Sequence, residues 1–168
     1  MIILIAGIGC IGKSSLRKKI ASNFSDQVIS VDMDYDSIIP HVKDKIVIVE
    51  SVHGLEDNAQ CYDKILYLKP PYNHIILWFK RAWIWFTTGI VDFSKPKGKM
   101  KRYSICNIPV ILRILGRNLF MRNRWINNDL KIIKNKFSGR TKDVSSIDEG
   151  YKIIKSWLNF DIGVEKLN

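Results

Sequence analysis

One short segment near the N-terminus constrains the fold of this chain more than any other. Residues 7–14 read Gly-Ile-Gly-Cys-Ile-Gly-Lys-Ser and match G-x-x-x-x-G-K-[ST] at every fixed position. The apolar run at residues 2–6 predicts a strand buried on both faces, and the spacing of apolar residues over 13–24 predicts a helix. A glycine-rich turn between a strand and a helix lets backbone N–H groups surround an anion. A glycine turn that precedes a helix by chance is the structural alternative.

Each fixed position of this loop has a distinct role toward a chain of phosphates. Glycines let the backbone approach closely, Lys13 neutralises the outer phosphates, and the Ser14 hydroxyl binds Mg²⁺. The sequence therefore predicts that ATP and Mg²⁺ bind here. The residues expected to contact the nucleotide are Gly7, Ile8, Gly9, Cys10, Ile11, Gly12, Lys13, Ser14 and Ser15.

The rest of the chain alternates short apolar runs with helical patterns. Further strands are expected at residues 28–31, 46–49, 65–68 and 131–134, and further helices at 74–91, 107–127 and 146–158. Ser146 and Glu149 fit a capping box at the start of the last helix. The pattern predicts an α/β fold in which a five-stranded parallel sheet carries helices on both faces. A length of 168 residues suits one domain, at 1–168.

The positive charge of the chain is concentrated in one segment. The formal net charge is +11, yet residues 80–142 hold 16 basic residues against only Asp92 and Asp129, a net charge of +14. Such a segment repels itself unless an anionic partner compensates it. Nucleotide phosphates, a nucleic acid backbone and an anionic membrane surface are the candidate partners, and a solvated basic face is the alternative.

Cysteine usage and hydropathy predict the compartment. Cys10, Cys61 and Cys106 form neither a CxxC motif nor a zinc-ligand pattern, which favours a reduced, intracellular protein. The first apolar run lacks a preceding basic region and is not expected to be a signal peptide. Lys80 and Arg81 interrupt the apolar segment 75–91, so no transmembrane span is expected. We expect a cytoplasmic protein.

Three segments together resemble the P-loop kinases of the nucleoside, nucleotide and polynucleotide kinase group, within the P-loop containing nucleoside triphosphate hydrolases. They are the loop at 7–14, the acidic end of the second strand at 31–36, and Phe-Ser-Gly-Arg-Thr-Lys at 137–142. The resemblance implies a three-layer P-loop fold with a basic lid between the fourth and fifth strands. Residues 74–128, an aromatic helix followed by the basic segment, fall in that interval.

Acidic residues follow the predicted second and third strands. Ligands of doubly wound sheets bind beyond the carboxyl ends of the strands, where Asp32, Asp34, Asp36 and Glu50 are expected. The resemblance implies that Asp34 is the base that activates the acceptor hydroxyl. Beside Ser14, Asp32 is a candidate to hold magnesium through water, and Glu50 is a candidate to orient magnesium-bound water or the acceptor. A solvated acidic turn and a helix cap are the alternatives.

Arginines dominate the predicted helix at 107–127. At about 100° per residue, Arg113, Arg117 and Arg124 fall within roughly 40° of one another and suit phosphate contacts from a closing lid. Arg122 falls inside the apolar band, where it needs an anion or a bend in the helix. Arg117, Arg122 and Arg124 are therefore candidate catalytic groups, and a solvated face is the alternative.

Weaker functional signals come from Arg140, the histidines and the aromatic residues. The resemblance implies that the loop after the fifth strand wraps adenine, and Arg140, assigned to that loop, is expected to stack on the base; a plain turn is the alternative. The histidines His41, His53 and His74 lie apart and indicate no metal site or triad. Core packing is expected for most aromatic residues of the helix at 74–91, with stacking on an acceptor base as the alternative. These residues are Trp78, Phe79, Trp83, Trp85 and Phe86.

The sequence therefore predicts a magnesium-dependent ATP kinase for a nucleotide-type acceptor, either a nucleoside monophosphate or a polynucleotide 5′-hydroxyl. One alternative is a nucleic-acid-binding P-loop ATPase or switch protein without a small acceptor. Another is a peripheral ATP-binding protein of an anionic membrane. A GTPase is disfavoured because Lys-Pro-Pro-Tyr at 69–72 stands where N-K-x-D would follow the fourth strand.

Overall fold

The structure is a computed structural model that describes residues 1–9, 11–32, 45–51, 55, 61–71, 74–88 and 108–165. Within them, five strands form one sheet: β1 (Ile2–Ala6), β2 (Val28–Asp32), β3 (Ile46–Glu50), β4 (Lys64–Leu68) and β5 (Thr141–Val144). The helices are α1 (Lys13–Asn23), α3 (His74–Thr88), α4 (Ile108–Lys136) and α5 (Ile147–Glu165). All neighbouring strands pair in parallel, which confirms an α/β fold with a five-stranded parallel sheet.

The strand order β2-β3-β1-β4-β5 puts β1 at the centre of the sheet. Ile5 of β1 is opposite Glu50, the last residue of β3, and Ala6 is opposite Tyr67 of β4. Asp32, the last residue of β2, is in turn opposite Glu50. The carboxyl ends of β1, β2 and β3 therefore meet at one edge, directly beside the glycine loop that follows β1.

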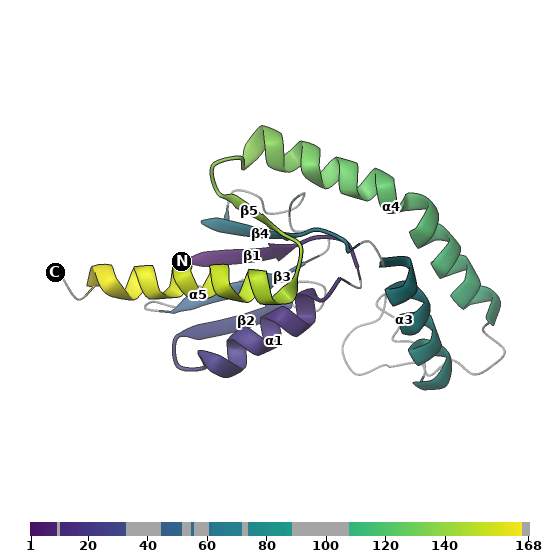
Figure 1. The fold of residues 1–168 in the computed structure, drawn as a ribbon, viewed down its shortest axis with the longest axis horizontal. Helices are drawn as coiled ribbons and strands as arrows, with labels where there is room; N and C mark the ends of the chain where they lie inside the picture. Colours follow the sequence, from purple (N-terminus) through teal and green to yellow (C-terminus); the bar gives the residue numbers. More distant parts are fainter. Residues whose placement is uncertain are drawn as a thin grey trace.

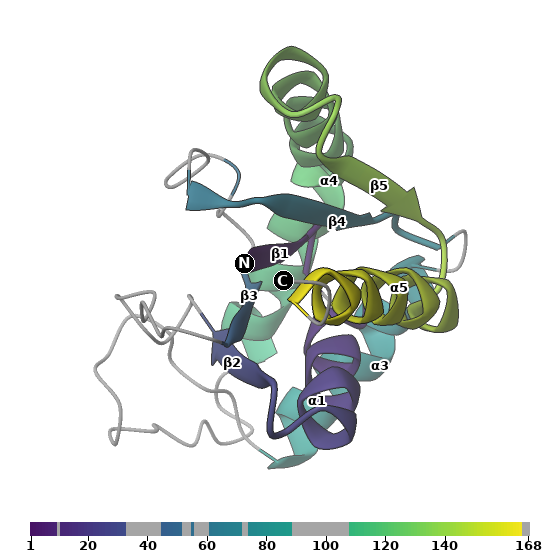
Figure 2. The same ribbon diagram turned by 90° about the vertical axis from the view of Figure 1, so that its left-hand side faces the viewer.

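Helices cover both faces of the sheet because β1 is apolar on both. Ile3 and Ile5 belong to a cluster that includes buried residues of α1 and α5. Leu4 and Ala6 belong to a second cluster, which the C-terminal half of α4 completes. Figure 2 shows α1 and α5 side by side on one face. The continuous apolar run of β1 thus anchors a helical layer on each side.

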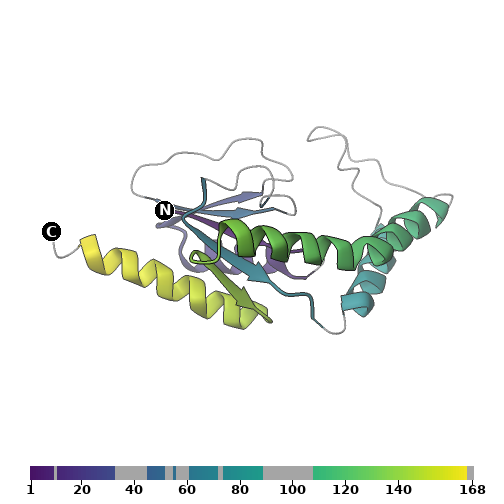
Figure 3. The same ribbon diagram turned by 90° about the horizontal axis from the view of Figure 1, so that it is seen from above.

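Helix α3 lies at the end of the sheet that carries the loop, and α4 leads from it onto the second face of the sheet. Figure 1 shows α3 beyond the carboxyl ends of β1 and β4. The long helix α4 contacts α3 and then passes across the sheet toward β5, as Figure 3 shows from above. None of the helices in the described ranges has the length and apolar character that crossing a bilayer requires.

The expected fifth strand at residues 131–134 is wrong. These residues continue α4, whose buried side includes Asp129 and Ile133 and leads to Phe137 just past its end. That spacing is helical, and the short apolar run within it has the appearance of a strand only when read alone. The observed β5 is Thr141–Val144, a polar edge strand that pairs with β4.

The predicted start of the last helix is confirmed, and its end is later than expected. The Glu149 N–H donates to the Ser146 hydroxyl at 3.1 Å, as a capping box requires. The Glu149 carboxylate accepts from the N–H of Ser145 at 2.8 Å, one residue before the expected partner. The helix then extends to Glu165, well beyond the expected residue 158.

Candidate functional site

The loop after β1 has a backbone that requires glycine at two positions. Gly7 has φ 132° and Gly12 has φ 99°, both in the region that side chains rarely tolerate. A Cβ atom on Gly7 would lie 2.7 Å from the carbonyl oxygen of Leu68, and one on Gly12 would lie 2.7 Å from the Ile147 side chain. Helix α1 begins immediately after Gly12, and this N-cap residue has no side chain to cap the helix N-terminus. The loop is therefore a closely packed backbone cradle that ends at a helix N-terminus, the arrangement that favours anions.

Lys13 places its ammonium group inside this cradle. The side chain is only 4% exposed, and Nζ donates to the carbonyl oxygens of Gly7 at 2.7 Å and Ile8 at 3.0 Å. A buried ammonium needs such polar partners because its desolvation is costly. The loop thus holds a positive charge against its own backbone, where a phosphate chain would need it.

Ser14 and Glu50 bring a hydroxyl and a carboxylate together at the same place. The Ser14 hydroxyl donates to Glu50 Oε1 at 2.6 Å, and Glu50 is 5% exposed. Magnesium typically takes one or two protein oxygens of this kind and keeps several waters. The pair therefore fits magnesium, although the described residues contain no cluster of three or more His, Cys, Asp or Glu suited to a metal.

Arg17 links the acidic strand ends, and sequence reasoning missed it. Its guanidinium donates to Glu50 Oε2 at 2.8 Å, to Asp32 Oδ2 at 3.2 Å and to the Ser30 hydroxyl at 2.7 Å. Asp32 and Glu50 are partners on adjacent strands, so the cation offsets the repulsion between two neighbouring carboxylates. The one available signal was the position of Arg17, one helical turn after Lys13.

His74 is the second residue that sequence reasoning missed. It is fully buried in the first turn of α3, and its Nε2 lies 2.9 Å from the Gly9 carbonyl oxygen. Arg122 of α4 donates from Nε to the other ring nitrogen, Nδ1, at 3.2 Å. Trp78 packs edge-on to His74 and lies over Gly9, since a Cβ atom there would be 3.4 Å from the indole. Two elements far from the loop in sequence therefore cover it.

Burial holds the pKa of His74 below its usual value. Desolvation is the largest cause, and the nearby cations Arg122 and Lys13 act in the same direction, while the bond to Gly9 opposes them. The neutral imidazole is thus the form that this environment favours.

A second buried contact fixes α4 to the sheet. The Tyr67 hydroxyl of β4 donates to Asp129 Oδ2 at 3.3 Å. Burial, followed by the Asp129 charge, raises the pKa of Tyr67 far above its usual range. Since Tyr67 is opposite Ala6 at the end of β1, the stretch of α4 between Arg122 and Asp129 passes beside the start of the loop.

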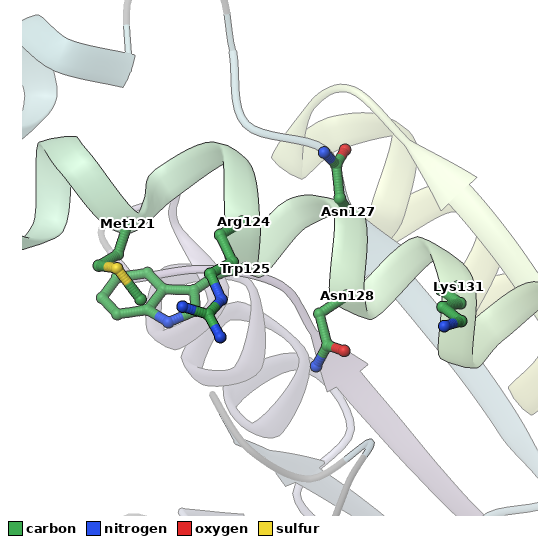
Figure 4. A pocket seen from close by; sticks show the side chains of 6 residues that line it. All are labelled: Met121, Arg124, Trp125, Asn127, Asn128 and Lys131. Atoms are coloured by element: carbon green, nitrogen blue, oxygen red, sulfur yellow. The ribbon is translucent and has the colours of Figure 1, made fainter.

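Residues 121–131 of α4 line a cavity of about 530 Å³, which Figure 4 shows from close by. Figure 4 also shows Met121, Arg124 and Trp125 projecting to the same side of the helix. The cavity has two cations, two amides and an aromatic ring among its described lining. The lining residues are Met121, Arg124, Trp125, Asn127, Asn128 and Lys131.

The structure brings only some of the predicted arginines to the loop. Arg122 is half-buried and reaches the loop through His74, which explains how it is accommodated within an apolar band. Arg113, Arg117 and Arg124 are exposed, and Arg124 lines the cavity.

The expected position of Arg140 after the fifth strand is wrong. Arg140 precedes β5, and its carbonyl oxygen accepts the N–H of Ile65 near the amino end of β4 at 2.9 Å. It therefore lies at the edge of the sheet opposite the glycine loop, because the true strand begins at Thr141. Cys10 and Asp34 lie outside the described residues, so their expected roles stay predictions.

The expectation of core packing for the aromatic helix is correct for Trp78 and wrong for two other residues. Trp78 is buried against the loop, whereas Phe79 is 56% and Trp83 is 67% exposed. They share an exposed stripe of α3 with Ile75 and Ile76. Helix α3 lies beyond the end of the sheet, so only one side of it has the sheet and loop to pack against.

No protein-family model, curated protein or solved structure matches this chain. The function is therefore inferred from the loop, the acids at the strand ends and the basic helix that approaches them.

Proposed function

We propose that this chain is a magnesium-dependent ATP phosphotransferase of the P-loop kinase type that acts on a nucleotide-type acceptor. The observation that carries the proposal is the 2.6 Å contact between the Ser14 hydroxyl and Glu50 at the end of β3. It joins the last position of the glycine loop to an acid on the strand adjacent to β1. P-loop enzymes hold magnesium with such a hydroxyl and strand-end acid.

The donor chemistry of the site fits ATP and Mg²⁺. The cradle between Gly7 and Gly12 has the backbone freedom and the helix N-terminus that a phosphate chain needs. Magnesium bound beside Ser14 and Glu50 would supply charge that stabilises the leaving phosphates. Lys13 neutralises the outer phosphates, and Asp32 orients the site through Arg17.

The proposed acceptor carries phosphate and a base. The cavity on α4 offers Arg124 and Lys131 for phosphate, Trp125 for stacking, and Asn127 and Asn128 for hydrogen bonds. Its volume is in the range of small-molecule sites. In this proposal Arg122, which reaches the loop through His74, stabilises the migrating phosphoryl group. Arg124 instead binds the acceptor, and Arg117 is exposed on α4. Asp34 is the proposed base.

Transfer of labelled phosphate tests this function directly. The protein is incubated with γ-labelled ATP and Mg²⁺ and with nucleosides, nucleoside monophosphates or 5′-hydroxyl oligonucleotides. Label in a monophosphate or an oligonucleotide is the expected result. Label released only as inorganic phosphate, and stimulated by nucleic acid, would instead support the ATPase or switch alternative.

Removing the two cations of the cavity should weaken the binding of the acceptor and leave the binding of ATP unchanged. Arg124→Ala combined with Lys131→Ala is expected to raise the acceptor KM at least about a hundredfold, since each charged contact to phosphate is worth about 1.5 to 3 kcal/mol. With an oligonucleotide acceptor, the log-log salt slope should also fall by ~0.7 per lost contact. Lys155→Ala, an exposed cation on α5, is the matched control. An unchanged acceptor KM in the double variant would contradict this assignment of the cavity.

The exposed stripe of α3 supports a second candidate function, binding to an anionic membrane surface. Ile75, Ile76, Phe79 and Trp83 span about 100° of the helix, and Lys80 beside them is exposed. Aromatic and aliphatic side chains next to cations are typical of helices that lie in a membrane interface.

Vesicle binding separates this candidate from the first. Phe79→Ala combined with Trp83→Ala should abolish binding to phosphatidylserine-containing vesicles, since both exposed rings would insert, and should leave ATP binding intact. Co-sedimentation with anionic and with neutral vesicles measures the effect. Leu130→Ala, which removes an exposed leucine of α4, is the control. Wild-type protein that binds neither kind of vesicle would remove this candidate.

A further inference from the structure

The two partners of His74 determine its tautomer. A carbonyl oxygen can only accept a hydrogen bond, so the Gly9 contact requires a proton on Nε2. A guanidinium can only donate, so the Arg122 contact requires a lone pair on Nδ1. Both bonds exist together only in the neutral Nε2–H imidazole. His74 therefore joins the phosphate loop to α4 in one protonation state alone.

We infer that His74 is a positioning residue that holds the Arg122 guanidinium beside the phosphate loop and releases it when the imidazole is protonated. This inference rests on the proposed function, and it describes how pH would regulate the same site. The residue touches neither a reacting atom nor a proposed metal ligand, and it acts through Gly9 and Arg122.

Holding the Gly9 carbonyl fixes part of the anion cradle. The bond from His74 Nε2 holds the Gly9 carbonyl oxygen at one position in the loop. Lys13 holds the carbonyls of Gly7 and Ile8 in the same way. The loop is thus oriented for phosphate before the ligand arrives, which lowers the cost of binding.

Holding Arg122 fixes a planar donor near the loop. Its Nε donates to His74 and its Nη1 donates to Asn123 Oδ1 at 3.1 Å, so two contacts set the plane of the guanidinium. A guanidinium of fixed orientation binds phosphate oxygens at a smaller entropic cost than a free side chain. Without the Nδ1 acceptor, Arg122 loses the contact that directs it to the loop.

Protonation reverses this arrangement. Among the residues that the structure describes, the charged groups that act on His74 are Arg122 from α4 and Lys13 from α1, and both are cations. An added proton on Nδ1 would oppose the Arg122 N–H and add a third positive charge. Since burial lowers the pKa of His74 below its usual 6.5, the contact is complete above pH 6.5 and is lost as the pH falls through this lowered pKa. Phosphoryl transfer should therefore show an acid limb in that range.

Two amide substitutions separate the two bonds. In His74→Gln the amide nitrogen can reach the position of Nε2 and keep the Gly9 bond, while the Nδ1 acceptor is lost. In His74→Asn the amide oxygen occupies the position of Nδ1 and keeps the Arg122 bond, while Gly9 is out of reach. Neither amide titrates, so both variants should lose the acid limb that His74 supplies.

The kinetic test uses turnover of MgATP with AMP or a 5′-hydroxyl oligonucleotide, whichever is phosphorylated. His74→Gln is expected to lower kcat about tenfold with little change in the KM for MgATP, and His74→Asn mainly to raise that KM by a similar factor. In an Arg122→Ala background, His74→Gln should have no further effect on kcat, because it acts through Arg122. Multiplicative losses, or an acid limb that persists in both variants, would overturn the inference.

An NMR measurement that needs no turnover tests the role of His74 independently of the proposed function. Nitrogen chemical shifts of the His74 ring report its tautomer and its titration by NMR. We expect the Nε2–H form in the wild-type protein and a rise in the pKa of His74 in Arg122→Ala, since a nearby cation is removed. An Nδ1–H tautomer, or a His74 titration unaffected by Arg122→Ala, would overturn the inference even if the kinase activity stands. Absence of transfer to every acceptor would reject the proposed function without changing these shifts.

Discussion

Replacing Lys13 with alanine is expected to reduce the turnover of ATP by at least about a hundredfold, the size of effect seen when one preorganised charge stabiliser is removed. Lys13 is buried in the glycine cradle and directs its ammonium at the carbonyls of Gly7 and Ile8. A bound phosphate chain would take over that ammonium as its partner. The loss should therefore be catalytic and should also weaken the binding of MgATP.

The stability of the Lys13 variants distinguishes this role from packing. Lys13→Met keeps the apolar stem within the cradle and removes only the charge, so it should unfold at nearly the wild-type temperature. Steady-state kinetics, MgATP titration and thermal unfolding measure the three quantities. Lys18→Ala, an exposed lysine of the same helix, is the control and should change none of them. A folded Lys13→Met variant with more than about a tenth of the wild-type turnover would contradict the phosphate role of the loop.

The centre of the fold could be predicted from the sequence because its signals are local and continuous. The run at residues 2–6 is apolar at every position, since β1 lies in the middle of the sheet and is covered on both faces. The glycine loop and α1 follow it directly, with the expected bounds to within one residue. These elements can be predicted without knowing which residues pack against them.

The outer part of the sheet could not be predicted in the same way. Thr141–Val144 is an edge strand with one buried residue, Val144, so burial imposes almost no apolar pattern on it. The apolar pair at 132 and 133 was more prominent, and it belongs to a helix whose buried side extends to Phe137. With the fifth strand expected at 131–134, Arg140 was expected after it, at the wrong edge of the sheet.

Some features of the site could not be predicted because they depend on contacts between residues that are distant in the sequence. The acids at the strand ends were expected because parallel strands end together, but the position of Glu50 beside Ser14 depends on β3 being next to β1. Arg17 is 33 residues from Glu50, and the partners of His74 are 65 and 48 residues away. No periodicity or motif connects such pairs, so a buried histidine could not be distinguished from an ordinary one.

Replacing Glu50 with glutamine should have the second-largest effect, through magnesium. The substitution keeps the size of the side chain and an oxygen that can accept from Ser14, and it removes the negative charge from the proposed metal site. We expect the Mg²⁺ concentration for half-maximal turnover to rise at least about tenfold, because magnesium relies on one or two carboxylates for its protein ligands. Turnover at saturating Mg²⁺ should also fall, since the remaining acid, Asp32, is bonded to Arg17.

The same substitution disturbs a partly buried ion pair, so its effect on stability must be measured beside its effect on magnesium. Arg17 keeps Asp32 and Ser30 when Glu50 becomes neutral, which limits the loss to about 1–2 kcal/mol, less than breaking an isolated buried pair. Asp148→Asn, which removes a solvent-exposed pair with Lys19, is the matched control for a lost carboxylate. If Glu50 were only the partner of Arg17, Glu50→Gln would lower the unfolding temperature and leave the Mg²⁺ requirement unchanged. A raised Mg²⁺ requirement in a protein that remains folded is the outcome that only a metal-binding role explains.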